Sequence, residues 1–162
     1  MPVPIVFAVV AHWWGSVFFQ SFFLHRYAAH RMFQLSHFWQ RTFHLLTYLF
    51  QGASYLNPRA YAVLHRMHHH FSDKPGDPHS PRLEPNPVKM MLNTLKDYRA
   101  VSNGTHPLAK PFEYDLVSWP ALDAVGRSRI SSLLWIGVYG AFYAIYATAT
   151  WQMLLIPVHA LM

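Results

Sequence analysis

Two short motifs contain the residues of this sequence that are best suited to bind a metal ion. The first is His25-Arg-Tyr-Ala-Ala-His30, and the second is His65-Arg-Met-His68-His69. The chain has 12 histidines and no cysteine, so a metal site must use imidazole, carboxylate or carbonyl ligands. Imidazole nitrogen suits iron, zinc and copper. The two motifs therefore indicate a histidine-rich transition-metal site.

The two motifs differ in how they would present their side chains on a helix. Relative to His65, the positions of His68 and His69 lie at about −60° and +40°, so the three rings share one face. We interpret this face as a metal site, because three clustered histidines without a metal would repel one another on protonation. His25 and His30 are about 140° apart on an α-helix. They converge only if the helix is distorted, or they bind different metals, and alone they fit two interfacial histidines equally well.

The composition indicates a membrane protein. Hydrophobic residues make up 52% of the 162-residue chain and charged residues 12%, whereas soluble domains average about 25% charged residues. The formal net charge is +6. The basic residues are spread along one long loop and favour a topology signal over nucleic-acid binding, so we expect no nucleic-acid partner. The length predicts one domain, residues 1–162.

The N-terminal segment predicts a transmembrane helix. Residues 3–24 contain no acidic residue, lysine or arginine, and about 20 apolar residues span a bilayer. A cleaved signal peptide is disfavoured, because the segment lacks a basic start and a small-residue cleavage site. His12 within this helix is expected to be a packed or interfacial residue. Arg26 and Arg31 indicate a cytoplasmic end.

The remaining chain predicts three further segments. Residues 38–64 are expected to form a helix in the membrane interface, because a crossing would put the two motifs on opposite sides of the bilayer. Residues 65–129 contain nine lysines and arginines and are expected to be cytoplasmic. Residues 130–162 are uncharged and predict a transmembrane helix over roughly 131–147, a bend near Thr148–Thr150 and a returning helix. The predicted fold is thus all-α and membrane-integral, with a cytoplasmic cap that carries the metal site.

The motifs are similar to the histidine boxes of the membrane fatty acyl desaturases of the stearoyl-CoA type. In that family an H-x4-H box precedes an H-x2-H-H box, which is followed by an acidic stretch ending in Asp-Pro-His, here Asp77-Pro78-His79. The resemblance covers nearly the whole chain. It implies that two non-haem iron ions use O2 and two electrons to introduce a cis double bond into an acyl chain. The implied ligands are His25, His30, His65, His68 and His69.

The same resemblance implies the partners. The substrate would be a fatty acyl-CoA or acyl-lipid, and electrons would come from cytochrome b5 or a ferredoxin-type donor. The protein would be a multi-pass protein of a bacterial cell membrane, with its boxes on the cytoplasmic side. The basic loop would suit an acidic donor or the phosphates of coenzyme A, although membrane topology explains its charges equally well. Asp77 and His79 are candidates to orient ligands or to contact the substrate head group, while turn formation is an equal alternative.

The sequence departs from the family pattern in one respect. It lacks a third H-x2-H-H box, as well as a further histidine and asparagine near the last helix. His106 and His159 match no box, and His70 lies about 140° from His65 on a helix. Because five histidines are too few for two iron coordination shells, we expect the sequence to be truncated before the third box. Turnover by this chain alone is expected to be poor.

Two other functions fit the residues. A membrane hydroxylase of the same superfamily, acting on fatty acids, alkanes or carotenoids, would differ in its product. A histidine-rich metal-binding or transport protein, for example for zinc, should carry ligands within a transmembrane pore, whereas these histidines cluster at a predicted interface. Aromatic side chains could line an acyl tunnel, although core packing or lipid contact explains each one better: Phe22, Phe23, Trp39, Tyr48 and Phe50.

Overall fold

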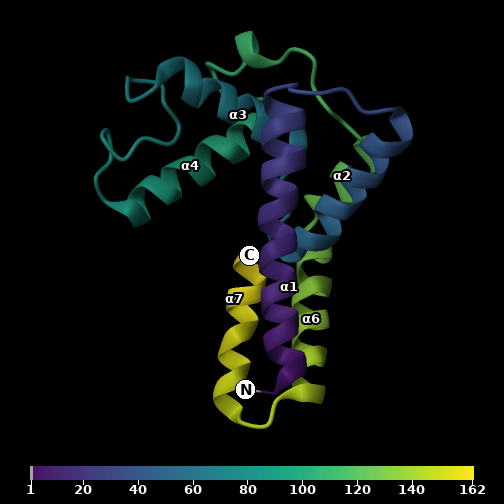
Figure 1. The fold of residues 1–162 in the computed structure, drawn as a ribbon. Helices are drawn as coiled ribbons and strands as arrows, with labels where there is room; N and C mark the ends of the chain where they lie inside the picture. The colour runs from purple at the N-terminus through teal and green to yellow at the C-terminus, as the bar shows by residue number, and fades with distance from the viewer. Residues whose placement is uncertain (1) are drawn as a thin grey trace. The chain divides into compact units, whose positions relative to one another are not determined.

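The computed structural model describes residues 2–162, which form helices and turns and contain no β-strand (Figure 1). The predicted all-helical class is therefore confirmed. The described residues divide into two compact units, where the length suggested one domain. Unit 1 comprises the residues up to Phe23, together with Leu35–Leu56 and Trp119–Met162, and unit 2 comprises Leu24–Gln34 and Asn57–Ser118.

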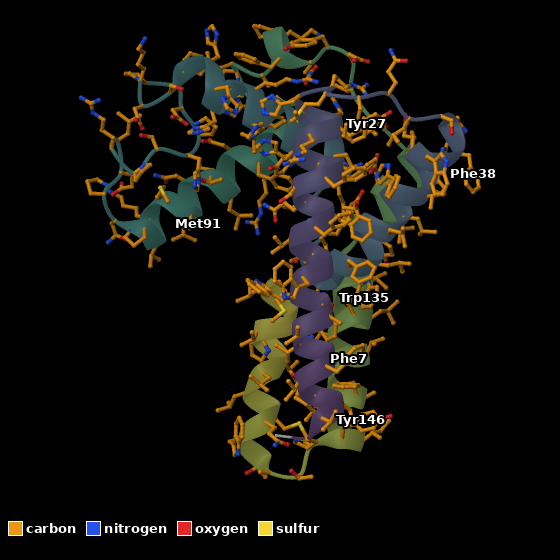
Figure 2. The ribbon with its side chains drawn as sticks, viewed as in Figure 1. Phe7, Tyr27, Phe38, Met91, Trp135 and Tyr146 are labelled. Atoms are coloured by element: carbon orange, nitrogen blue, oxygen red, sulfur yellow. The ribbon has the colours of Figure 1, made fainter. Side chains whose placement is uncertain are left out.

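One helix in the described residues is long and apolar enough to cross a membrane. It runs over Val3–Ala29 without a break and consists of α1 (Val3–Phe19) and the π-helix η1 (Gln20–Ala29). Only 17% of its most apolar stretch is buried, which differs from the core helix of a soluble protein. Phe7 is 72% exposed and projects from α1 (Figure 2). This apolar exposure suggests association with a membrane.

The C-terminal part of unit 1 forms a helical hairpin beside α1 (Figure 1). The chain turns where the sequence predicts, between α6 (Arg129–Tyr146) and α7 (Leu155–Leu161), through the 3-10 helix η4 (Thr150–Leu154). The buried side-chain oxygen of Gln152 accepts a hydrogen bond from the backbone N–H of Thr148 at 2.8 Å. This bond closes the turn.

His12 is packed within unit 1, as the sequence predicts. Its Nδ1 lies 3.1 Å from Nδ1 of His159, and its ring centroid lies 5.6 Å from that of Tyr139. The contact joins α1 to both arms of the hairpin.

The segment 38–64, expected to be one interfacial helix, forms two helices in two units. α2 (His37–Gln51) ends in the 3-10 helix η2 (Gly52–Ser54), and α3 (Pro58–Phe71) begins four residues later. Gly52 has a φ of +54°, a conformation that favours glycine. The Asn57 side chain accepts from the backbone N–H at position 60, with proline at the first helical position. These helix-boundary signals divide the segment into two helices, and an interfacial location of either helix stays a prediction.

Aromatic packing joins α1 to α2 within unit 1. The ring centroids of Phe19 and Phe50 lie 5.1 Å apart, and Phe50 lies against Gly15, where a Cβ atom would have no room. Phe22 and Phe43 also lie 5.1 Å apart. Packing of this kind accounts for the residues considered as tunnel candidates, namely Phe22, Phe23, Trp39, Tyr48 and Phe50.

A buried hydrogen-bond network ties α5 (Pro120–Gly126) to the rest of unit 1. Asp123 is 5% exposed and accepts hydrogen bonds from the Tyr55 hydroxyl at 2.9 Å and from His44 Nε2 at 3.1 Å. Burial would raise the pKa of Asp123, but hydrogen bonds from His44, the Trp119 backbone N–H and Tyr55 together lower it. The carboxylate is therefore ionised at neutral pH.

We expect Asp123→Ala to destabilise the chain by at least about 2 kcal/mol. The change leaves the Tyr55 hydroxyl and His44 imidazole buried with fewer partners, at about 1–3 kcal/mol for each buried group left unpaired. Denaturant unfolding of the purified chain in detergent, followed by circular dichroism, measures the effect. Lys110→Ala, at a side chain that is 91% exposed, should change the stability by less than about 0.5 kcal/mol. An Asp123→Ala chain as stable as the parent would refute this role.

Unit 2 is built on the packing of α3 against α4 (Pro87–Ser102). Its core consists of buried apolar residues of the two helices and of the following loop: Ala60, Val63, Leu64, Met67, Val101 and Ala109. On α3 these side chains lie roughly 130° round the helix from the face that carries His65, His68 and His69. The core therefore fixes α3 while leaving its histidine face available.

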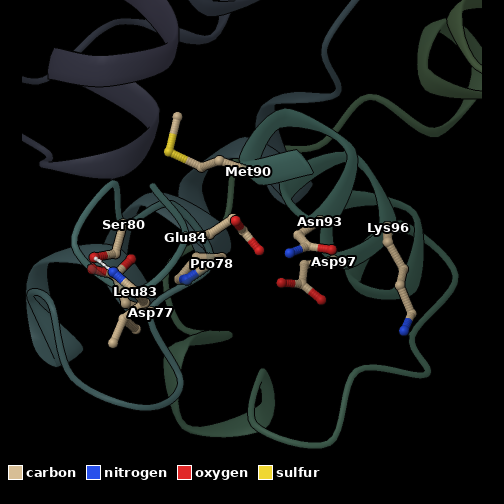
Figure 3. A pocket seen from close by; sticks show the side chains of 9 residues that line it. All are labelled: Asp77, Pro78, Ser80, Leu83, Glu84, Met90, Asn93, Lys96 and Asp97. Carbon is tan, nitrogen blue, oxygen red and sulfur yellow. Dashed lines mark hydrogen bonds between the residues drawn. The ribbon is translucent and has the colours of Figure 1, made fainter. Parts of the chain in front are cut away.

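A polar cavity of about 280 Å³ lies between α4 and the loop that precedes it (Figure 3). Polar and charged side chains dominate its lining, which includes Asp77, Ser80, Glu84, Asn93, Lys96 and Asp97. Such walls suit water or a polar group and do not match an acyl chain.

Candidate metal centre

A π-helix brings the two histidines of the first motif together. In a π-helix the hydrogen bonds run from residue i to i+5, and here the N–H of His30 donates to the carbonyl of His25 at 3.1 Å. The two ring centroids are 4.8 Å apart. The sequence allowed convergence only on a distorted helix, and η1 is that distortion. Short π-helical segments occur frequently at functional sites.

Four of the five predicted ligands cluster in unit 2, and we call them the histidine tetrad: His25, His30, His65 and His69. Ring-centroid distances between its members are 4.4, 4.6, 4.8, 4.9 and 4.9 Å. Two imidazoles that share one ion at a metal–nitrogen distance of about 2.1 Å have centroids about 4.5–5 Å apart. The ligand nitrogens of His25, His30 and His65 all lie within 4.8 Å of one another, so these three side chains fit a single metal ion. His69 lies beside them, with its Nε2 3.0 Å from Nε2 of His65.

His65 lies at the centre of the tetrad. Its Nε2 is 2.9 Å from Nε2 of His30 and 3.0 Å from Nε2 of His69. Burial and then the neighbouring histidines lower the pKa of His65 from 6.5 to about 3, and burial likewise lowers the pKa of His30. Neutral imidazole is the form that binds metals. The arrangement thus keeps His65 and His30 in the ligand form at neutral pH.

Arg66 fixes the end of the π-helix against α3. Its guanidinium donates to the carbonyls of Ala28 at 3.2 Å, Ala29 at 2.9 Å and Phe112 at 3.1 Å, and also to the carbonyl of Tyr114. Arg66 is 8% exposed and directly follows His65 in the sequence. It therefore holds the first motif next to the second. From the sequence, Arg66 was expected only to be one of the basic residues of the region 65–129. No sequence motif indicated its contacts with these carbonyls.

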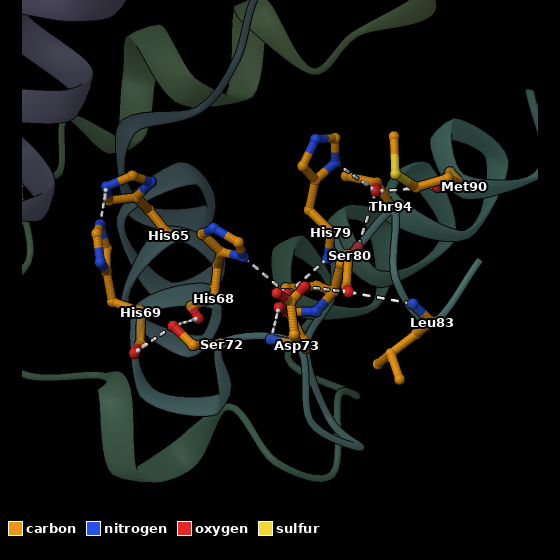
Figure 4. Close-up of polar contacts among 12 residues, drawn as sticks. His65, His68, His69, Ser72, Asp73, His79, Ser80, Leu83, Met90 and Thr94 are labelled. Carbon is orange, nitrogen blue, oxygen red and sulfur yellow. Dashed lines mark hydrogen bonds and ion pairs between the residues drawn. The ribbon is translucent and has the colours of Figure 1, made fainter. Parts of the chain in front are cut away.

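His68 lies beside the tetrad and is oriented by a carboxylate (Figure 4). Its ring centroid is 5.8 Å from that of His69, and its Nδ1 lies 2.8 Å from Oδ1 of Asp77. The Asp77 side chain is fully buried and also accepts from the backbone N–H groups of Asp73 and His79. Burial would raise the pKa of Asp77, but these hydrogen bonds lower it. An ionised Asp77 keeps the proton on Nδ1 of His68 and leaves its Nε2 as a metal ligand.

His79 is oriented in a similar way. Its Nδ1 lies 3.1 Å from the Thr94 hydroxyl, which donates to the Pro78 carbonyl at 2.8 Å. The hydroxyl therefore accepts from Nδ1 of His79, which leaves Nε2 with a lone pair. The ring centroids of His79 and His68 are 6.3 Å apart. Both side chains could serve a second ion beside the tetrad.

The remaining histidines of unit 2 lie outside this arrangement. His70 packs with Phe71 and Phe112 at centroid distances of 4.9 and 5.4 Å. His106 lies 3.7 Å from the Asp97 carboxylate.

Comparison with known proteins found a partial similarity to one curated enzyme. The chain is 36% identical over 77 residues to hex-5-enoyl-[acyl-carrier protein] acetylenase of Moorena producens (strain JHB). The matched stretch covers 47% of this chain and 23% of that protein, so the chain spans about a quarter of the length of this curated relative. No family model matches the chain, and no solved structure matches it.

We expect His65→Ala to weaken metal binding by more than about 10-fold, because it removes the imidazole that contacts two other members of the tetrad. Titration of the purified chain with Co²⁺, followed by absorption spectroscopy, measures the affinity. His70→Ala is the matched control and should bind as the parent does. Equal affinity of the His65→Ala chain would exclude the tetrad as the metal site.

The metal-free chain should lose stability as the pH falls. The folded-state pKa of His65 is about 3, whereas an unfolded histidine titrates near about 6.5. Between these values the unfolded chain binds more protons, so stability rises with pH across this window. Unfolding midpoints between pH 7 and pH 4.5 should therefore fall less steeply in His65→Gln than in the parent or in His70→Gln. Parallel profiles would refute the role of His65.

Proposed function

We propose that this chain is the histidine-box part of an O2-dependent fatty acyl desaturase or acetylenase, with the tetrad as one of two iron sites. The observation that supports the proposal most strongly is the convergence of His25, His30 and His65 from two motifs, at the spacing of ligands to one ion, with His69 beside them. The similarity to an acetylenase over 77 residues supports an acyl substrate. Desaturation and acetylenation share one chemistry, since each removes two hydrogens from adjacent carbons of an acyl chain.

The donor set fits iron. The tetrad offers neutral nitrogen ligands only, and imidazole suits iron as well as zinc and copper. When bound, iron supplies the oxidising power that C–H cleavage needs and that side chains lack. His25, His30 and His65 would hold one ion with His69 beside them, and His68 would serve the second while Asp77 keeps its Nδ1 protonated. Arg66 preserves the geometry by holding the π-helix end in place.

The substrate and partners follow from the same proposal. The acyl chain is carried by coenzyme A or a lipid, and the similarity to an acetylenase of an acyl-carrier-protein substrate adds acyl carrier protein as a third carrier. Electrons come from cytochrome b5 or a ferredoxin-type donor. The exposed apolar helix Val3–Ala29 supports a location in a membrane, and the proposed arrangement is multi-pass in a bacterial cell membrane.

A metal-transport protein is the second candidate. The contact between His12 and His159 lies within the apolar helices of unit 1, a location expected for intramembrane ligands of a transporter. Metal analysis of purified protein separates the two functions. Stoichiometric iron supports the desaturase or acetylenase, whereas stoichiometric zinc without iron favours a metal-transport protein.

The decisive experiment replaces His68 by alanine in the full-length protein expressed in a host that lacks the product. Gas chromatography with mass spectrometry of the acyl chains should show loss of the double or triple bond, with membrane insertion unchanged. Asp77→Asn should lower product formation by about 10- to 100-fold, because Asp77 contacts no other predicted ligand than His68 and acts through its orientation. His70→Ala should retain activity. Unsaturation at the normal rate in His68→Ala would end this assignment, and an added hydroxyl would favour a hydroxylase.

A further inference from the structure

An amphipathic helix of unit 2 exposes its apolar face. On α4, the residues Val88, Met91, Leu92 and Leu95 are 68%, 56%, 60% and 41% exposed. Their i, i+3, i+4, i+7 spacing places them on one stripe, from which Met91 projects in Figure 2. We call these four residues the α4 stripe. Contiguous apolar surface of this kind marks an interaction site.

The opposite face of α4 is already occupied. Val101 is 2% exposed within the core shared with α3, and the Tyr98 hydroxyl accepts a hydrogen bond from the Asn57 backbone N–H at 2.8 Å. The Thr94 hydroxyl donates to the Pro78 carbonyl. Rotating α4 to bury its stripe would break all of these contacts, so the stripe stays exposed until another surface covers it.

Basic side chains border the stripe. Lys89 and Lys96 lie on one flank, about 90–110° from its centre, and Arg99 continues it at the C-terminal end. Lys89 pairs with Glu84 at 3.0 Å, while Lys96 and Arg99 make no ion pair within residues 2–162. No acidic residue lies on the stripe itself. An apolar stripe bordered by lysine and arginine is typical of helices that lie in a membrane surface.

We propose that α4 lies in the surface of a bilayer that contains anionic lipid. The stripe contacts the acyl region, and Lys89, Lys96 and Arg99 contact the lipid phosphates. The basic border is complementary to anionic head groups, which favours lipid over an apolar protein surface. The sequence led us to expect the region 65–129 in the aqueous phase, whereas this inference places α4, one helix of that region, in the membrane surface. The inference does not rest on the metal centre.

The lipid contact would orient the histidine face. α3 and α4 share one core, so a fixed depth of α4 also fixes the rotation of α3 relative to the bilayer. His65, His68 and His69 would then keep a constant height above the surface from which an acyl chain is delivered.

Because the chain has no cysteine, single-cysteine labelling tests the proposal directly. Met91→Cys and Leu95→Cys would carry a polarity-sensitive NBD fluorophore, and Asn93→Cys, exposed on another face of the same helix, is the matched control. The full chain is reconstituted into vesicles of phosphatidylcholine and phosphatidylglycerol. We expect blue-shifted emission and quenching by nitroxide lipids at positions 91 and 95, and neither at position 93.

Several outcomes would overturn the proposal. Emission at positions 91 and 95 as water-exposed as at 93 would show that the stripe does not meet lipid. A blue shift that depends on protein concentration and resists lipid quenching would assign the stripe to a second copy of the chain. Equal quenching in vesicles without phosphatidylglycerol would remove the role of anionic lipid. Circular dichroism of each labelled chain checks that the helices are intact.

Discussion

The candidate metal centre depends on one guanidinium. The two histidine motifs are separated by more than 30 residues, and an α-helical first motif would turn its histidines apart. Arg66 satisfies carbonyls at Ala28 and Ala29 and also holds the loop at Phe112 and Tyr114. A π-helix end has carbonyls without helical donors, and a buried arginine that donates to several of them offsets this cost. The arginine thereby stabilises a backbone conformation that a helix would otherwise avoid.

The sequence predicted that the histidines of the second motif share one helix face. It predicted that the two histidines of the first motif converge only if their helix is distorted. His65, His68 and His69 follow from α-helical geometry alone, because their helix is regular and well capped at Asn57. Convergence of the first pair required the π-helix, which depends on contacts with Arg66 that are distant in sequence. Helical periodicity carries no information about such contacts. The sequence offered Asp77 as a residue that could orient a ligand, but it did not indicate that Asp77 would contact His68 and separate it from the tetrad.

The helix boundaries within residues 38–64 were also predicted incorrectly. The segment 38–64 has enough apolar residues to be interpreted as one helix, yet Gly52 and the Asn57–Pro58 pair divide it between two units. Those residues are strong local signals that the overall hydropathy obscured. Apolar length was a better guide at the N-terminus, where the helix over Val3–Ala29 has no proline beyond its first turn.

The nitrogen contacts within the tetrad also bear on how an ion enters. Nε2 of His65 lies within hydrogen-bonding distance of Nε2 of both His30 and His69, and each such contact requires a hydrogen between the two nitrogens. A proton held between two of these nitrogens occupies the lone pair that a metal ion would take. Loading is accordingly coupled to tautomer exchange: the proton must move to Nδ1 or to solvent. The rate of metal uptake would then depend on the rate of this proton transfer as well as on the metal concentration.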